Sequence, residues 1–239
     1  MKMHELSWPP GVQTVIESDA DVLARRLAQH VASLLGRRLE SDSRASLVVS
    51  GGSTPERFFK SLRTQPIEWS RVDVTLADER WVGEDSPDSN GHLVRENLLR
   101  EAAAAARFYP LKHAGNSVQE GQAACESSLA DFKWPIDVLV LGMGNDGHTA
   151  SLFPDAPELA EALDPENPCK TAVLRPPSQH LERLSLTRRV LAGARTRILH
   201  LRGEDKLSTL EKAFRDPQRI TDMPVRAFLC PGLQVFWSP

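Results

Sequence analysis

Residues 138–154 read VLVLGMGNDGHTASLFP and contain the signals that decide the fold class. The stretch begins with the last four residues of an apolar strand predicted over residues 136–141. A glycine-rich polar turn follows directly, and it contains the titratable residues Asp146 and His148. A strand that ends in such a turn is typical of an α/β sheet, in which ligands bind beside the carboxyl ends of the strands.

The glycines at 142, 144 and 147 also match G-x-G-x-x-G, the fingerprint of a dinucleotide-binding turn. That fingerprint requires a long helix starting near its third glycine, and a proline inside a helix costs about 3 kcal/mol. Pro154 and Pro157 interrupt any such helix, so we expect no nicotinamide cofactor here. His148 suits a general base oriented by a carboxylate, although a buried histidine held by a structural hydrogen bond is an open alternative.

The same alternation of short apolar runs and amphipathic stretches recurs along the chain. Strands are predicted at residues 14–17, 45–50, 72–76, 136–141, 170–174, 183–186, 197–201 and 233–237. Helices are predicted from about residue 18 to 35, around 56–62, through Leu93, Leu98 and Ala102–Ala106, and over 118–132, 188–193 and 204–214. This pattern predicts an α/β protein with a mostly parallel sheet flanked by helices, and a single domain over residues 1–239 because no repeat or linker interrupts it.

Composition excludes several classes of function. The formal net charge of −3 provides no overall attraction to nucleic acid or to an anionic membrane, so we expect neither partner. The three cysteines are far apart and the seven histidines include no H-x-x-x-H pair, so we expect no disulfide framework and no metal site. No apolar run has the length of a signal peptide or a membrane span, which favours a cytoplasmic protein.

Two further polar segments follow predicted strands. SGGSTP (Ser50–Pro55) combines glycines with hydroxyls at a strand–helix junction and lacks the G-K-[ST] of a Walker A loop. It suits a phosphate, and the alternative is that Ser53 or Thr54 only caps the next helix, because Ser53 and Glu56 have capping-box spacing. The segment Asp78–Arg80 combines two carboxylates with a guanidinium that suits an anion, and the alternative is a solvated ion pair.

Taken together, these blocks resemble the 6-phosphogluconolactonase family. The resemblance is carried, in order, by SGGSTP, by DERWV with Asp88–Asn90, by GMGNDGHTASLFP, by Pro176-Pro177 with RLSLT (183–187), and by RGEDK (202–206). The related glucosamine-6-phosphate isomerase/deaminases tend to have DEY and DGHIAFNEP, whereas this chain has DER and DGHTASLFP, which favours the lactonase.

The resemblance implies a Rossmann-like three-layer fold and hydrolysis of 6-phospho-D-glucono-1,5-lactone to 6-phosphogluconate in the oxidative pentose phosphate pathway. It implies His148 as the base that activates water, Asp146 as its orienting partner or a sugar ligand, and Arg80 as a cation facing the sugar or the oxyanion. The implied substrate- and phosphate-binding residues are Ser50, Gly51, Gly52, Ser53, Asp78, Arg183 and Lys206. No metal or organic cofactor is implied.

Three other functions compete with the lactonase. They are a glucosamine-6-phosphate isomerase/deaminase of the same fold, a non-catalytic sugar-phosphate-binding protein, and the nicotinamide oxidoreductase that the prolines disfavour. The pattern is compatible with a monomer or a small homo-oligomer, and it leaves open which group stabilises the oxyanion and whether the 1,5- or the 1,4-lactone is preferred.

Overall fold

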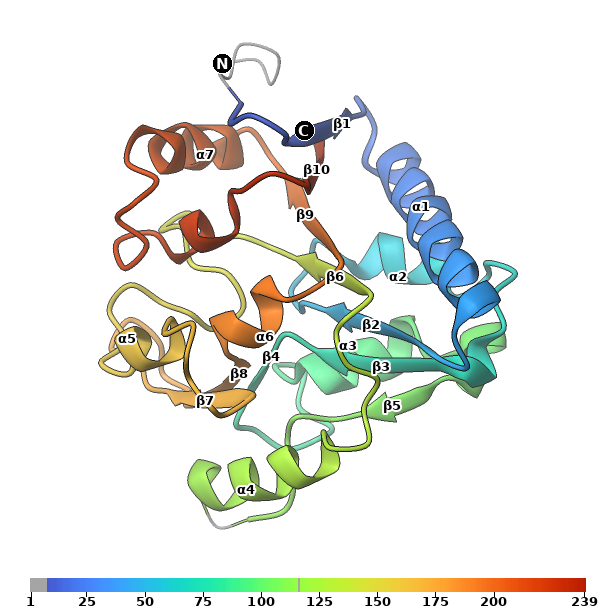
Figure 1. Cartoon of the computed structure of the whole chain (residues 1–239), viewed down its shortest axis with the longest axis horizontal. Coiled ribbons are helices and arrows are strands. Elements are labelled where there is room, and N and C mark those ends of the chain that lie inside the picture. Colours follow the sequence, from blue (N-terminus) through green and yellow to red (C-terminus); the bar gives the residue numbers. More distant parts are fainter. Residues whose placement is uncertain (1–7, 116) are drawn as a thin grey trace.

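The computed structural model describes residues 8–115 and 117–239, which form a central sheet covered on both faces (Figure 1). In this part of the chain, seven parallel strands are ordered β1-β10-β9-β6-β2-β3-β5. They are β1 (Gln13–Ile16), β2 (Ala45–Val49), β3 (Val72–Leu76), β5 (Arg107–Tyr109), β6 (Val138–Leu141), β9 (Thr196–Arg202) and β10 (Leu233–Ser238). The strands β2, β3 and β6 are buried along their whole length, so the core lies around the centre of the sheet.

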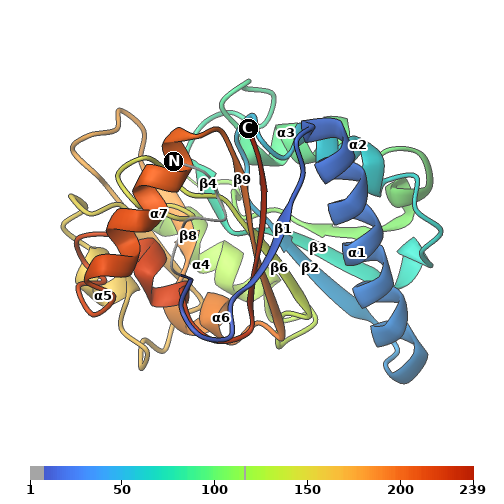
Figure 2. The ribbon, with the colours of Figure 1, turned by 90° about the horizontal axis from the view of Figure 1, so that it is seen from above.

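Helices lie on both sides of this sheet. The helices are α1 (Ala20–Ser41), α2 (Glu56–Leu62), α3 (Asn90–Asn97), α4 (Val118–Ser128), α5 (Leu159–Ala162), α6 (Arg188–Ala192) and α7 (Asp205–Arg215), with 3-10 turns η2 (Trp69–Arg71), η3 (Glu101–Ala105) and η4 (Pro224–Phe228). Viewed from above, α1 and α2 lie on one side of the strands and α5 and α7 on the other (Figure 2). The predicted α/β class with a mostly parallel sheet between helices is confirmed.

The first helix shows how local sequence determines an element. The side chain of Asp19 accepts hydrogen bonds from the backbone N–H groups of Asp21 and Val22, both at 2.8 Å, and so caps the helix, whose start was predicted near residue 18. Apolar residues recur every three or four positions along it, and that spacing places them on one face, which is buried against the sheet.

A second, smaller sheet was not expected from the sequence. The strand β4 (Asp78–Arg80) pairs with β8 (Arg183–Leu186), which pairs with β7 (Thr171–Leu174), and both pairings are antiparallel. The segments of β7 and β8 were predicted as strands, but nothing in their sequence indicated a separate sheet. Its register places Arg80 directly opposite Arg183.

One predicted helix is wrong in its second half. The helix through Leu93 and Leu98 was expected to continue into the alanines at 102–106, but α3 ends at Asn97. Glu101 has a φ of 53°, which lies in the left-handed region and cannot continue a right-handed helix. The alanines therefore form the 3-10 turn η3 instead.

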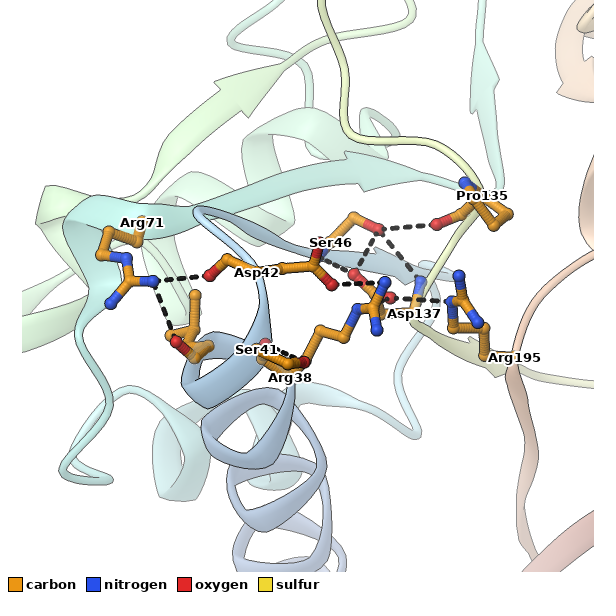
Figure 3. A network of polar contacts seen from close by, with 9 residues as sticks. Arg38, Ser41, Asp42, Ser46, Arg71, Pro135, Asp137 and Arg195 are labelled. Atoms are coloured by element: carbon orange, nitrogen blue, oxygen red, sulfur yellow. Dashed lines mark hydrogen bonds and ion pairs between the residues drawn. The ribbon is translucent and has the colours of Figure 1, made fainter.

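A buried carboxylate organises the edge of the sheet that lies opposite the carboxyl ends of the strands (Figure 3). Asp137, directly before β6, accepts from the backbone N–H of Ser46 at 2.9 Å. It also pairs with the Nε atoms of Arg38, at 2.9 Å, and Arg195, at 3.3 Å. Because Arg38 belongs to the last turn of α1, this cluster fastens that helix to the amino ends of β2 and β6.

Candidate active site

A cavity of about 250 Å³ opens at the carboxyl ends of the central strands. Segments that follow β2, β3, β6 and β9 line it, together with β8 from the small sheet. Nine of the predicted site residues line this cavity: Ser50, Gly51, Gly52, Ser53, Asp78, Arg80, His148, Arg183 and Lys206. The tenth, Asp146, is not among the lining residues but contacts His148, which is. The cavity is therefore where five chain segments that are distant in sequence meet.

The turn after β6 holds a histidine–carboxylate pair. Nδ1 of His148 lies 2.6 Å from Oδ1 of Asp146, and the same oxygen accepts the backbone N–H of His148 at 3.0 Å. The ring stacks on Phe153, with 3.9 Å between centroids. With Nδ1 oriented by the carboxylate, Nε2 of His148 is the nitrogen left for another partner.

The charge state of this pair follows from its surroundings. Burial acts to raise the pKa of Asp146, but the hydrogen bonds and the charge of His148 outweigh burial and lower that pKa below its usual value. Asp146 is therefore an ionised acceptor at neutral pH, which is the form that orients an imidazole N–H.

The glycines of this turn make room for the pair. A Cβ on Gly144 would lie 2.2 Å from Nδ1 of His148 and 2.6 Å from Oδ1 of Asp146. Gly147 has a φ of +83°, a conformation that residues with a Cβ rarely adopt. After Gly147 the chain forms turns and only a four-residue helix, α5, so the long helix of a dinucleotide site is absent from this described segment. Gly144 and Gly147 therefore allow the close packing and the chain conformation that place His148 beside Asp146.

The SGGSTP loop is free to receive a ligand. The alternative that Ser53 or Thr54 caps the next helix is wrong, because the N-cap of α2 is Pro55 and no side chain caps it. The Oγ atom of Ser50 is buried without a hydrogen-bond partner. A Cβ on Gly51 would lie 1.8 Å from Oδ1 of Asn90, so the glycine lets the two segments pack closely.

Glu79 connects β4 to the start of α3 on this side of the cavity. Its carboxylate accepts from Ser89 Oγ and from the backbone N–H groups of Arg80, Asn90 and Gly91, at 2.7 to 3.1 Å. Burial raises the pKa of Glu79, while these hydrogen bonds act to lower it. Glu79 therefore has a structural role, and it holds the start of α3 beside β4.

Arg80 and Arg183 occupy directly opposed positions on the adjacent strands β4 and β8. Arg80 donates from Nη1 to the backbone oxygen of Asp88 at 2.6 Å, and Arg183 donates from Nη2 to Gln179 at 2.8 Å. The Nε atom of each is buried and has no partner. Like charges in directly opposed positions of a sheet destabilise it, and an anion between or near the two guanidinium groups would relieve this repulsion.

Burial and neighbouring charges change the pKa of Arg183. Burial, followed by the nearby charge of Arg80, lowers the pKa of Arg183, and the carboxylates of Asp78 and Glu79 oppose that change. Asp78 is itself buried and accepts from Ser151 Oγ at 2.6 Å. The solvated ion pair considered as the alternative for Asp78–Arg80 is therefore wrong, because both carboxylates are buried and bonded elsewhere.

Lys206 is a further cation on the cavity wall. Its Nζ donates to Oδ1 of Asn145 and lies 3.6 Å from Asp205. Asn145 belongs to the turn that holds His148, so Lys206 links the start of α7 to that turn.

Among the polar cavity-lining residues that the sequence-based prediction left without a role are Asn90, His200 and Arg202. Asn90 was quoted within a motif but received no role, and its amide donates to the backbone oxygen of Asp78 at 2.9 Å. His200 and Arg202 lie on β9 at positions where no local motif marks them. The alternation of side chains along β9 could have placed both on one face.

No group of three or more His, Cys, Asp or Glu residues in residues 8–115 and 117–239 could hold a metal ion. Within the same ranges, no helix is long and apolar enough to cross a membrane.

Comparison with known proteins identifies the family. The sequence model of glucosamine-6-phosphate isomerases/6-phosphogluconolactonase matches residues 18–237. The chain belongs to this family. Within it, the 6-phosphogluconolactonase of Pseudomonas aeruginosa is 45% identical over 241 residues, covering all of both chains. The 6-phosphogluconolactonase of Mesorhizobium japonicum is 44% identical, with 92% of this chain and 93% of the relative covered.

Solved structures of the glucosamine-6-phosphate isomerase/6-phosphogluconolactonase family agree with this assignment. A 6-phosphogluconolactonase from Shewanella baltica superposes with a TM-score of 0.93 at 39% identity, covering 96% of this chain and 99% of that one. A monomeric glucosamine-6-phosphate deaminase superposes with a TM-score of 0.77 at 15% identity, covering 95% and 97%. At that identity only the fold is shared, so the fold alone does not distinguish the two activities of the family.

Proposed function

We propose that this chain is a 6-phosphogluconolactonase, which hydrolyses 6-phospho-D-glucono-1,5-lactone to 6-phosphogluconate. The observation that carries the proposal is the pair of His148 and Asp146 at a cavity whose unpaired buried polar atoms belong to Ser50, Arg80, Arg183 and His200. A base beside a pocket of donors and cations suits an anionic ester. Relatives at up to 45% identity named 6-phosphogluconolactonase support the same substrate.

The chemistry needs no covalent enzyme intermediate, because a lactone is an activated ester. Nε2 of His148 takes a proton from water as the water oxygen bonds to C1, and the carbonyl becomes a tetrahedral oxyanion. The oxyanion then collapses, the bond from C1 to the ring oxygen breaks, and the protonated His148 returns its proton to that oxygen. Asp146 is a positioning residue, because it acts on the substrate only through His148.

Charge stabilisation and binding are assigned to the remaining wall. Arg80 faces the sugar or the developing oxyanion, and a preorganised donor of this kind is worth about 10²–10³-fold in turnover. Ser50, Gly51, Gly52 and Ser53 seat the phosphate, Lys206 and Arg183 supply its countercharge, and Asp78 contributes to the substrate-facing wall. Binding energy from the remote phosphate then positions C1 beside His148.

The organisation of the chain enters the proposal as well. We take residues 1–239 as one domain, and the family match from residue 18 to 237 supports this. Independence from metals and organic cofactors, a cytoplasmic location, and a monomer or small homo-oligomer stay predictions from the sequence.

The decisive experiment presents freshly made 6-phosphogluconolactone to the purified protein and measures 6-phosphogluconate after subtracting the spontaneous rate. Rapid turnover of the lactone, with no ammonia released from glucosamine 6-phosphate, is expected. Ammonia release without lactone turnover would replace the proposal by the deaminase. Thermal stabilisation by phosphate, with turnover of neither the lactone nor glucosamine 6-phosphate, would indicate a sugar-phosphate-binding protein.

A further inference from the structure

His200 is a buried histidine on the cavity wall to which the proposed reaction gives no role. It lies on β9 and lines the cavity, yet it is only 7% exposed. Its Nδ1 atom is buried without a hydrogen-bond partner, and the edge of its ring contacts Phe58 at 6.0 Å between centroids. Because a buried polar atom without a partner is costly, this nitrogen requires an explanation.

Packing alone does not explain a histidine at this position. The other residues of the inner part of β9, Ile198, Leu199 and Leu201, are apolar and 0–2% exposed. An aliphatic side chain at position 200 would satisfy the same neighbours and leave no polar atom unpaired. Burial lowers the pKa of His200 to about 4, so the ring is neutral near pH 7 and carries one N–H donor.

The surroundings of His200 indicate an anionic oxygen as its partner. Side chains alternate along a strand, so Arg202 lies on the same face as His200, and Lys206 follows at the start of α7. Both cations line the same cavity, as does Ser50 with its unpaired Oγ. Leu141, the last residue of β6, pairs with Leu199 of β9, and Gly142 and His200 are the next residues of the two segments. No atom lies within 4 Å of where a Cβ on Gly142 would be, so the cavity is open beside Gly142. Donors line the cavity around this opening.

We propose that His200 is a substrate-binding residue whose Nδ1–H donates a hydrogen bond to an oxygen of the substrate's phosphate group. The proposal rests on the proposed function for the identity of the substrate. It assigns the β9 side of the cavity, with His200, Arg202 and Lys206, to recognition of the phosphate. It makes His200 a determinant of preference for phosphorylated over unphosphorylated lactones.

The test uses two substitutions of nearly equal size. His200→Asn keeps an amide where Nδ1 lies, whereas His200→Leu has the same branching and no polar atom. For His200→Leu we expect KM for 6-phosphogluconolactone to rise about tenfold or more, the loss typical of a hydrogen bond to a charged acceptor. We expect kcat to change less than about threefold, since the group acts far from C1, and His200→Asn to stay within about threefold of wild type in both constants.

Two controls separate this binding role from other effects. Unphosphorylated glucono-1,5-lactone should be hydrolysed equally by wild type and both variants, because it lacks the oxygen that His200 contacts. Stabilisation by inorganic phosphate in a thermal-shift titration should be weaker in His200→Leu than in wild type and His200→Asn. This titration needs no turnover, so it tests His200 even if the proposed lactonase activity fails.

Several outcomes would overturn the proposal. One is a folded His200→Leu protein with unchanged KM and unchanged response to phosphate. Another is an equal loss in His200→Leu and His200→Asn, which would show that the ring acts by packing. A third is an equal loss with the unphosphorylated lactone, which would move the contact from the phosphate to the sugar.

Discussion

Nδ1 of His148 lies 2.6 Å from Oδ1 of Asp146, and the contact depends on the missing side chain of Gly144. The carboxylate also accepts the backbone N–H of His148, so one acidic residue fixes both the chain and the ring. Stacking on Phe153 limits rotation of the ring further. The imidazole is therefore held in one orientation before substrate arrives, as efficient proton transfer requires.

Removing the imidazole tests the assigned base. We expect His148→Ala to lower kcat for 6-phosphogluconolactone by about 10²–10⁴-fold, the usual contribution of a general base, with little change in melting temperature. The measurement is the initial rate minus the spontaneous rate. His180→Ala, at an exposed histidine that does not line the cavity, is the matched control and should retain full turnover. Unchanged turnover in His148→Ala would refute the assignment.

Filling the space beneath the pair tests its geometry. In Gly144→Ala the new Cβ would lie 2.2 Å from the ring of His148, so the ring must move away from Asp146. We expect kcat to fall by about tenfold to a hundredfold, since a displacement near 1 Å can cost that much. Gly36→Ala is the control, because no atom lies within 4 Å of its Cβ position inside α1. It should gain about 0.5–1 kcal/mol in unfolding free energy and keep full activity. Wild-type kinetics in Gly144→Ala would contradict the close packing.

Glu79 links stability to the cavity. Glu79→Gln weakens four hydrogen bonds that hold Arg80 and the start of α3, and we expect a loss of about 2–3 kcal/mol in unfolding free energy. We also expect a higher KM, because Arg80 and Asn90 line the cavity. Glu84→Gln, whose carboxylate is exposed and 3.8 Å from Arg95, should change neither quantity.

The pH dependence of this effect has a defined sign. Burial raises the pKa of Glu79, so folded protein binds its proton more tightly than unfolded protein does. The part of the stability that comes from this raised pKa is fully present below the unfolded pKa and is lost as the pH rises through the folded pKa. Urea unfolding between pH 4 and 7 should therefore show the advantage of wild type over Glu79→Gln decreasing with pH. An advantage that grows with pH would contradict the raised pKa.

The cluster around Asp137 should affect stability alone. Asp137→Ala leaves the N–H of Ser46 without its carboxylate and removes the anion that Arg38 and Arg195 share, at the edge of the sheet opposite the cavity. We expect a loss of about 2–3 kcal/mol in urea unfolding with unchanged KM at a temperature where the protein is folded. Asp42→Ala removes the more exposed partner of Arg38 and should cost less than about 1 kcal/mol. Equal losses in both variants would argue against burial as the cause.

The cysteines offer a chemical test of the core. Burial raises the pKa of the Cys125 thiol to about 12, so almost no thiolate exists at pH 8, whereas Cys169 is exposed. We expect a thiol-specific disulfide reagent to modify Cys169 promptly in native protein and Cys125 only after unfolding. Mass spectrometry of the modified peptides would report the order. Prompt native labelling of Cys125 in a Cys169→Ser variant would contradict its position inside the core.

Local patterns in the sequence were sufficient for most of the fold. The strand over residues 72–76 was predicted at its observed bounds, because apolar Val72, Val74 and Leu76 alternate there with polar residues. The helix predicted from about residue 18 agrees with the start of α1 at Ala20, because capping by Asp19 acts within one turn of the helix. The prolines after His148 excluded a long helix by their own covalent geometry. The polar turns at strand ends predicted where a site would form, since parallel strands end at a common edge.

Only the tertiary structure decided which of these side chains face one another. The opposition of Arg80 and Arg183 depends on an antiparallel register between segments far apart in the chain, and their own residues do not encode that register. No local motif distinguishes His200 within its apolar strand, and its place on the cavity wall depends on the pairing of β6 with β9. The local sequence does not show that Glu79 is buried. Its carboxylate accepts the N–H groups at the start of α3 only because that helix packs beside β4. Such contacts arise from the order in which strands pack, whereas capping, helix breaking and apolar patterning act within a few residues.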